Sequence, residues 1–169
     1  LAHQQYQQTD NMTERLAAMR VLVWNDAPQA AAVLADFYQK FQHEALAIDQ
    51  WFMLQAAHPQ VSQATIAQLV AHPAYDITVP NRIRSITSGL ISRPVNMWGE
   101  IGVTHLLHLA KQLDQQNPIV GSRLVQALSR WYTLATPRRE EVQAQLQQLQ
   151  TQVKSKNVSE SIANMLDVE

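Results

Sequence analysis

Helix-ending signals recur along this chain at intervals that suit one helix each, and this spacing constrains the fold more than any other feature. In His58-Pro59 and His72-Pro73, proline pushes the residue before it out of the α region, so each pair ends a helix. Between such breaks apolar residues recur at helical spacing, as in the run Val33, Leu34, Phe37, Tyr38 and Phe41. The pattern predicts helices of roughly ten to eighteen residues joined by short polar loops.

Capping residues and prolines predict where the helices begin. The expected N-caps are Asp10, Asp26, Ser62, Asn81, Asn117 and Ser159, and the prolines expected in first turns are Pro28 and Pro137. We expect helices over about 11–23, 28–41, 44–57, 62–71, 81–91, 98–115, 118–134, 137–154 and 159–166, with 75–79 as an extended linker. The predicted fold is therefore all-α, an irregular superhelical array of paired antiparallel helices similar to HEAT or armadillo solenoids, forming one domain over 1–169. A strict repeat period is missing, which disfavours tetratricopeptide and ankyrin repeats.

The charge balance limits the classes of partner. Thirteen Lys and Arg face fourteen Asp and Glu, for a net charge of −1, whereas duplex nucleic acid and anionic membranes attract strongly basic surfaces. We therefore expect neither nucleic acid nor a membrane as partner. The chain has no cysteine, which excludes disulfides and thiolate catalysis. It begins with Leu1 instead of Met, so we expect it to be part of a longer polypeptide.

The motifs that could carry chemistry are weak. His105 and His108 lie three residues apart and share a helix face, but spacing supplies no third ligand, so histidines beside a leucine stripe are the favoured interpretation. His43-Glu44 begins like the zinc motif H-E-x-x-H, yet Ala47 occupies the second histidine position. The chain has neither a G-x-S-x-G elbow nor a glycine-rich phosphate loop. We predict no catalytic, cofactor-binding or metal-binding residue in this chain.

Two arginines sit unexpectedly close to apolar helix faces. The stripe expected after Asn117 consists of Val120, Leu124, Ala127, Leu128 and Trp131. Arg123 falls inside this stripe, and Arg84 flanks the face formed around Ile83 and Ile86, while Arg82 is expected to point away from Arg84. A guanidinium cannot lose its charge, so burial requires a carboxylate, backbone carbonyls or a water-filled cavity. The residues alone favour a buried or snorkelling ion pair over a functional cavity.

Several segments resemble the C-terminal helical domain of bacterial aminopeptidase N. They are Asp10-Asn11-Met12-Thr13-Glu14-Arg15-Leu16-Ala17-Ala18-Met19, Ala35-Asp36-Phe37-Tyr38 with Trp51-Phe52, Pro80-Asn81-Arg82-Ile83-Arg84-Ser85, and Asn117-Pro118-Ile119-Val120-Gly121-Ser122-Arg123-Leu124. The likeness extends over nearly the whole chain. In one place this sequence departs from the family, because a shorter turn, Met97 to Val103, replaces an acidic, glycine-rich one.

The resemblance implies a role without chemistry for this chain. Members of that family are zinc metallopeptidases that remove N-terminal residues from peptides, and their H-E-x-x-H, distant glutamate and G-x-M-E-N motifs lie in an upstream catalytic domain. The chain is then expected to cap that active site, to line the peptide cavity and to be inactive alone, with zinc bound upstream and the parent cytoplasmic. The matching positions that face bound substrate are Arg84 and Arg123. Its partners would be the upstream domain and peptide substrates.

A different class of function stays open from the sequence. The chain could be a free-standing helical-repeat scaffold that binds a protein along its concave face. That alternative predicts a reading frame that starts close to Leu1 with its own Met. An H-E-x-x-H motif upstream in the same gene would decide for the peptidase.

Overall fold

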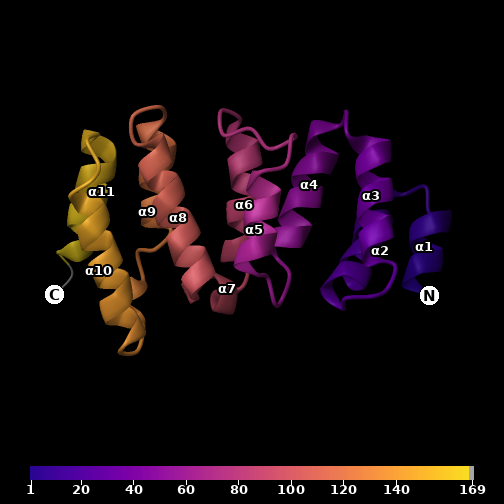
Figure 1. The fold of residues 1–169 in the computed structure, drawn as a ribbon, viewed down its shortest axis with the longest axis horizontal. Coiled ribbons are helices and arrows are strands. Elements are labelled where there is room, and N and C mark those ends of the chain that lie inside the picture. Colours follow the sequence, from indigo (N-terminus) through magenta and orange to yellow (C-terminus); the bar gives the residue numbers. More distant parts are fainter. Residues whose placement is uncertain (168–169) are drawn as a thin grey trace. The chain divides into compact units, whose positions relative to one another are not determined.

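The computed structural model describes residues 1–167. Within that range the regular secondary structure is helical and no β-strand occurs, which confirms the all-α prediction (Figure 1). The helices are α1 (Ala2–Gln8), α2 (Met12–Trp24), α3 (Ala30–Phe41), α4 (Ala45–Ala56), α5 (Gln63–Val70), α6 (Pro80–Ile91), α7 (Pro94–Trp98), α8 (Glu100–Leu113), α9 (Pro118–Gln126), α10 (Arg138–Gln150) and α11 (Lys156–Leu166). A short 3₁₀ turn, Trp131–Thr133, precedes α10. Over the described range, none of these helices is both long and apolar enough to cross a bilayer.

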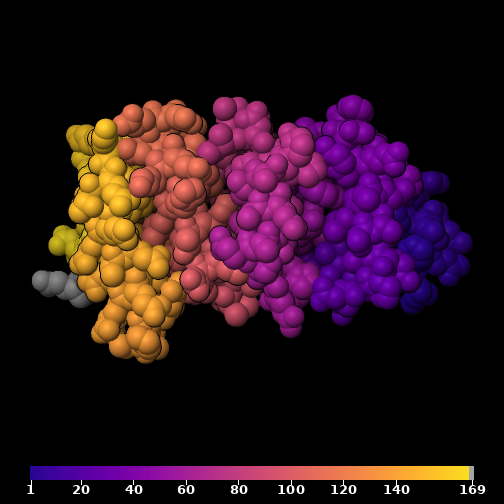
Figure 2. Space-filling view, in the orientation of Figure 1, coloured from indigo at the N-terminus to yellow at the C-terminus, as the bar shows by residue number. Residues whose placement is uncertain are grey.

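The chain divides into two compact units, Leu1–Met97 and Trp98–Glu169. Within each unit the side chains fill the space between neighbouring helices (Figure 2). The expectation of one domain over 1–169 therefore stays a prediction, and the two units are described separately below.

The first unit is organised around α4, which packs against α3, α5 and α6 and touches α2. Its core contains the buried side chains of Phe37, Ile48, Phe52 and Leu90. Helices α4 and α6 approach closely at Gly89, where a Cβ atom would lie 2.6 Å from the Met53 carbonyl oxygen. Only glycine permits this separation of the two helices.

The carboxyl end of α4 is completed by side chains that follow α6. The last carbonyls of a helix have no partner within the helix and must find one elsewhere. Arg93 donates from Nε to the Ala57 carbonyl at 2.8 Å, and Asn96 donates from Nδ2 to the His58 carbonyl at 2.9 Å. These two bonds tie the segment after α6 to the end of α4.

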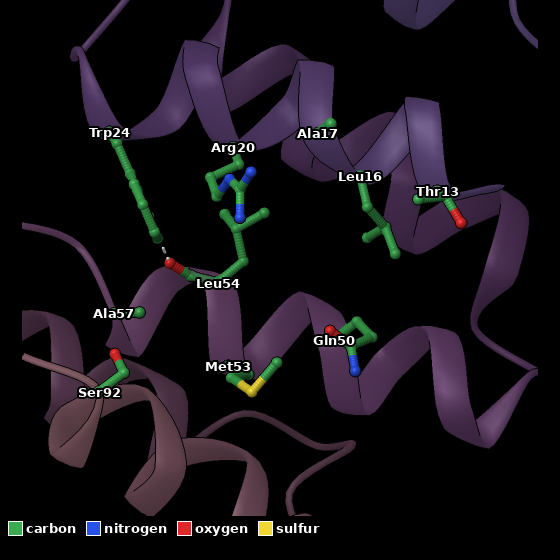
Figure 3. A pocket seen from close by; sticks show the side chains of 10 residues that line it. All are labelled: Thr13, Leu16, Ala17, Arg20, Trp24, Gln50, Met53, Leu54, Ala57 and Ser92. Carbon is green, nitrogen blue, oxygen red and sulfur yellow. Dashed lines mark hydrogen bonds between the residues drawn. The ribbon is translucent and has the colours of Figure 1, made fainter.

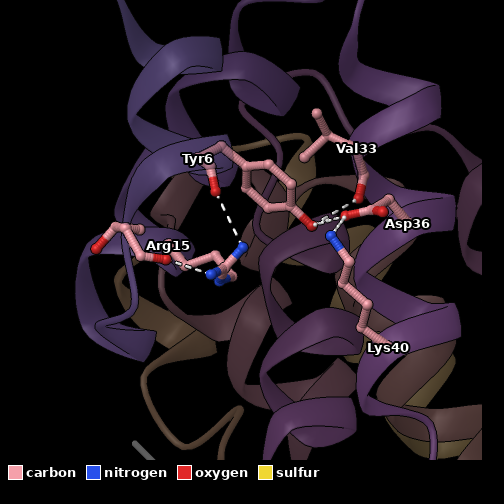
Figure 4. Close-up of polar contacts among 6 residues, drawn as sticks. Tyr6, Arg15, Val33, Asp36 and Lys40 are labelled. Atoms are coloured by element: carbon pink, nitrogen blue, oxygen red, sulfur yellow. Dashed lines mark hydrogen bonds and ion pairs between the residues drawn. The ribbon is translucent and has the colours of Figure 1, made fainter.

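The short first helix is held by polar contacts that reach across thirty residues of sequence (Figure 4). The Tyr6 hydroxyl donates to Asp36 at 2.9 Å, and Asp36 also accepts from Lys40. Arg15 donates to the carbonyls of Tyr6 and Thr9. Burial, with the hydrogen bond to Asp36, raises the pKa of Tyr6, so the hydroxyl stays a donor at neutral pH. Helix α1 was not predicted, because its stability depends on these distant partners.

The second unit packs α8, α9, α10 and α11 around a core that includes the buried Leu106, Leu109, Leu128 and Ile162. Asp114, which is 4% exposed, links the end of α8 to the start of α11. It accepts from the Lys154 amide at 2.6 Å, the Ser155 amide at 3.1 Å and the Ser155 hydroxyl at 2.6 Å. Burial acts to raise the pKa of Asp114, but these hydrogen bonds outweigh it and hold the pKa below its ordinary value.

The caps at Ser62 and Asn117 are confirmed, since each side chain accepts from the amide three residues later. Four other predicted caps are wrong. Asn11 replaces Asp10, Gln29 replaces Asp26, Val79 replaces Asn81 and Ser155 replaces Ser159. Residues 75–79 form a linker outside the helices, with a turn at 77–78 and extended backbone at Val79.

The expected helix 98–115 is confirmed as α8, within two residues at each end, whereas the short helix α7 before Gly99 was not predicted. One predicted helix extent is wrong. The expected helix 118–134 ends at Gln126, eight residues early.

Candidate functional site

Two grooves flank α4 in the first unit. The first, called the Trp24 groove, lies between α2 and α4, has a volume of about 390 Å³ and is drawn in Figure 3. Its lining residues are Thr13, Leu16, Ala17, Arg20, Trp24, Gln50, Met53, Leu54, Ala57 and Ser92. The second, called the Arg84 groove, has a volume of about 240 Å³ and is lined by Leu46, Asp49, Gln50, Met53, Asn81, Arg84, Ser85 and Ser88. Gln50 and Met53 line both grooves, so the grooves adjoin along α4.

Arg84 lies in the Arg84 groove and is exposed. The prediction that Arg84 flanks the apolar face of its helix, with Arg82 pointing away, is therefore wrong. Arg82 is the arginine on the packed face, with its side chain 11% exposed and its Nε 3.3 Å from Asp49 Oδ1. Its guanidinium carbon lies 5.2 Å from the centre of the Phe52 ring. Arg82 therefore forms the structural ion pair, and Arg84 is directed to solvent from the same helix.

Arg123 is also exposed, so its predicted burial is wrong. The buried positions on α9 are Gly121, Ser122, Leu124 and Val125. Arg123 belongs to the second unit and Arg84 to the first. Their exposure removes the need for a buried counter-ion and leaves both guanidiniums available to a ligand.

The end of the Trp24 groove is an assembly of side chains that was not predicted from the sequence. The indole Nε1 donates to the Leu54 carbonyl at 2.9 Å. The guanidinium carbons of Arg93 and Arg20 lie 4.4 and 5.3 Å from the centre of the Trp24 ring. The spacing of Arg20 and Trp24, four residues apart on one helix, was the signal that could have revealed half of this arrangement.

The histidine pair does not fit a metal. His105 Nε2 is enclosed without a hydrogen-bond partner, and burial, followed by the nearby His108, lowers the pKa of His105 to about 4. Its imidazole is therefore neutral at pH 7. Across residues 1–167 there is no group of three or more His, Cys, Asp or Glu side chains that could hold a metal ion.

Comparison with known proteins relates the whole fold to one family. The family model described as "Domain of unknown function (DUF3458_C) ARM repeats" matches residues 1–167. Aminopeptidase N of Haemophilus influenzae is 33% identical over 135 residues, covering 78% of this chain and 16% of that protein. Aminopeptidase N of Escherichia coli is 32% identical over 153 residues, covering 88% of this chain and 18% of that protein.

A solved structure shares the fold. Legionella pneumophila aminopeptidase A, crystallised in complex with aspartic acid, matches 98% of this chain with a TM-score of 0.88 and 21% identity, and the match covers 20% of that chain. This chain thus spans less than one fifth of the length of the two curated relatives above. The match over residues 1–167 confirms the armadillo-type prediction, and the chain belongs to the DUF3458_C family of ARM-repeat domains, the C-terminal helical domain of bacterial aminopeptidase N.

Proposed function

We propose that this chain is the part of a zinc-dependent aminopeptidase that caps the active site and lines the cavity for peptide substrates. The parent removes N-terminal amino acids from peptides, and its zinc and catalytic residues belong to an upstream domain. Arg84 and Arg123 face the cavity. The observation that carries the proposal is the similarity to aminopeptidase N over most of this chain, combined with the exposure of both arginines.

The chemistry of the two arginines suits this role. A guanidinium presents several N–H donors in a fixed plane and can bind the carboxylates and backbone carbonyls of a peptide. It stays protonated, so this binding does not depend on pH near neutrality. In the Arg84 groove, Asp49 is already paired with Arg82, so the neighbouring carboxylate does not neutralise Arg84. The cavity wall thus offers positive charge to the peptide chain and supplies no nucleophile or base.

Replacing either Arg84 or Arg123 with alanine in the full-length parent is expected to lower kcat/KM for peptides about tenfold. The reason is that a charge-assisted hydrogen bond to the substrate contributes about 1.5–3 kcal/mol. The measurement is steady-state cleavage of a tetrapeptide, with zinc content determined on the same samples. Zinc content is expected to be unchanged, because the metal is held elsewhere.

Arg130→Ala is the matched control, since Arg130 is also exposed but is not one of the two positions proposed to face the cavity. It is expected to leave kcat/KM within about twofold of wild type. Unchanged kcat/KM in both Arg84→Ala and Arg123→Ala would refute the cavity role. Loss of zinc in either variant would mean that the effect is structural.

The 169-residue chain alone is expected neither to cleave an alanyl amide nor to bind zinc stoichiometrically. Hydrolysis by a zinc enzyme requires a zinc ion with three protein ligands and an activated water. His105 and His108 together supply at most two of these ligands. The measurement is hydrolysis of alanyl p-nitroanilide, with zinc bound after dialysis determined by atomic absorption. Robust cleavage by the purified chain would contradict the proposed division of roles.

The alternative is a free-standing scaffold for protein–protein interaction. The sequence of the gene upstream of this chain distinguishes it from the proposal. An H-E-x-x-H motif upstream in the same reading frame is expected if the chain belongs to a peptidase. A Met codon directly before Leu1, with no such motif in frame, would favour the scaffold.

A further inference from the structure

The Trp24 groove has the size and lining of a small-ligand site. Its volume of about 390 Å³ falls within the range of roughly 300–1,000 Å³ that is typical of ligand pockets. The walls are largely apolar, built by Leu16 and Ala17 of α2 and by Met53 and Leu54 of α4 (Figure 3). Such walls favour an apolar side chain, because burying it removes apolar surface from water.

Arg20 gives this groove a positive charge that nothing in the lining neutralises. It is the one Arg, Lys, Asp or Glu among the residues that line the Trp24 groove. Arg20 is exposed, and none of the ion pairs found in residues 1–167 includes it. The groove therefore combines an apolar surface with one unopposed guanidinium, which selects for a ligand that carries an apolar group and a single negative charge.

The ring on which the Arg20 guanidinium rests is fixed before any ligand arrives. Trp24 is fixed by its hydrogen bond to the Leu54 carbonyl and by Arg93, whose own Nε is bonded to the Ala57 carbonyl. Arg20 then rests over the Trp24 ring at 5.3 Å. A rigid ring beneath the guanidinium lowers the conformational entropy lost on binding, so more of the interaction energy appears as affinity.

We propose that the Trp24 groove binds the carboxyl-terminal residue of a peptide, with the apolar side chain between α2 and α4 and the terminal carboxylate on Arg20. This inference rests on the proposed function, which makes peptides the ligands of this surface. Only the end of a peptide places a carboxylate and an apolar side chain on the same residue. An internal Asp or Glu carries its negative charge on the side chain, so it has no apolar side chain to place against the walls of the groove.

The adjoining Arg84 groove continues the same surface. Because Gln50 and Met53 line both grooves, an extended peptide that crosses α4 contacts the Arg84 groove and then the Trp24 groove. The two arginines would therefore act on different parts of one ligand. Arg84 would contact the peptide chain, and Arg20 its carboxyl end. This arrangement predicts a preference for peptides with apolar carboxyl-terminal residues.

The test is calorimetric titration of the full-length protein that carries this chain with N-acetyl-Ala-Ala-Leu. The acetyl group removes the free amine on which an aminopeptidase acts, so binding is measured without turnover. Three ligands are compared: the free acid, its carboxyl-terminal amide, and N-acetyl-Ala-Asp-Ala amide. The protein variants are wild type, Arg20→Gln, and Arg130→Gln as a charge-matched control outside the groove.

The free acid is expected to bind wild type and Arg130→Gln alike and Arg20→Gln about tenfold more weakly, since one charge-assisted hydrogen bond is lost. The amide is expected to bind all three proteins equally and about tenfold more weakly than the free acid binds wild type. Equal binding of acid and amide to wild type, or an equal loss in Arg130→Gln, overturns the proposal. Binding of the Asp peptide as tightly as the free acid does so too, because the groove would then recognise an acidic side chain.

Failure of this inference can be distinguished from failure of the proposed function. If this binding is absent while Arg84→Ala and Arg123→Ala still lower kcat/KM, only the role of the Trp24 groove fails. If the binding is present while the full-length protein shows no peptidase activity, the proposed function fails.

Discussion

Asp114→Ala is expected to lower the free energy of unfolding by about 3 kcal/mol, because it removes the acceptor for three donors. The amides of Lys154 and Ser155 and the Ser155 hydroxyl all point at this carboxylate, which is 4% exposed. Hydrogen bonds to a charged group contribute about 1.5–3 kcal/mol, and unsatisfied buried donors add a desolvation cost. Urea unfolding followed by circular dichroism measures the total. Amide hydrogen exchange is expected to show that protection is lost at the start of α11.

The same carboxylate makes part of the stability depend on pH. The pKa of Asp114 is lower in the folded state than in the unfolded state, so the folded form binds protons less readily. Its contribution is fully present above the unfolded carboxyl pKa of about 4 and is lost as pH falls through the lower folded value. Asp114→Asn, which keeps the shape, should therefore differ most from wild type at pH 7. The difference should shrink in acid.

Asp10→Asn is the control for both measurements, because Asp10 is exposed and accepts none of the hydrogen bonds described for residues 1–167. Its free energy of unfolding is expected to stay within about 0.5 kcal/mol of wild type. A gap between Asp114→Asn and wild type that widened below pH 4 would contradict the sign of the pKa shift.

Gly89→Ala is the second large effect, an expected loss of up to about 2 kcal/mol in the free energy of unfolding. The new Cβ would lie 2.6 Å from the Met53 carbonyl oxygen and 2.7 Å from Ala56 Cβ, so α4 and α6 must move apart. Overpacking of this kind costs about 1–3 kcal/mol. Exchanging glycine for alanine gains about 1 kcal/mol of helix propensity, which offsets part of that cost. Hydrogen exchange should show the loss in α4 and α6.

Gly121→Ala is the comparison that isolates the helix contact. There the nearest atoms are Val158 Cγ2 at 3.1 Å and the Ala110 carbonyl oxygen at 3.2 Å, and the valine methyl can yield. The gain in propensity should then leave this variant within about 1 kcal/mol of wild type. The interpretation of Gly89 would be wrong if Gly89→Ala proved as stable as Gly121→Ala.

Local signals predicted much of the fold because helix caps and apolar periodicity act over four residues or fewer. Ser62 and Asn117 were identified from such signals. Ser155 was missed in favour of Ser159, since both are serines close to the start of an amphipathic stretch. What distinguishes Ser155 is Asp114, forty-one residues away, and no local pattern contains that partner.

The candidate site was less accessible to sequence for the same reason. The choice between Arg82 and Arg84 depends on Asp49, which lies on a different helix. The stripe that seemed to bury Arg123 included Trp131, but α9 ends at Gln126, so Trp131 does not share its face. Resemblance to a family predicted a cavity role for both arginines, which stays a prediction, whereas the physical argument for their burial was incorrect.

The bonds from Arg93 and Asn96 to the carbonyls of Ala57 and His58 determine where this chain can be shortened. A fragment that stops at Ile91, the last residue of α6, keeps every long helix of the first unit but loses both side-chain donors, so the Ala57 carbonyl loses its bond and the His58 carbonyl keeps only the Val61 amide. A fragment that stops at Met97 retains them, at a cost of six residues. The cutting point for the first unit therefore lies past the end of α6, since the end of α4 is completed by side chains from the segment that follows α6.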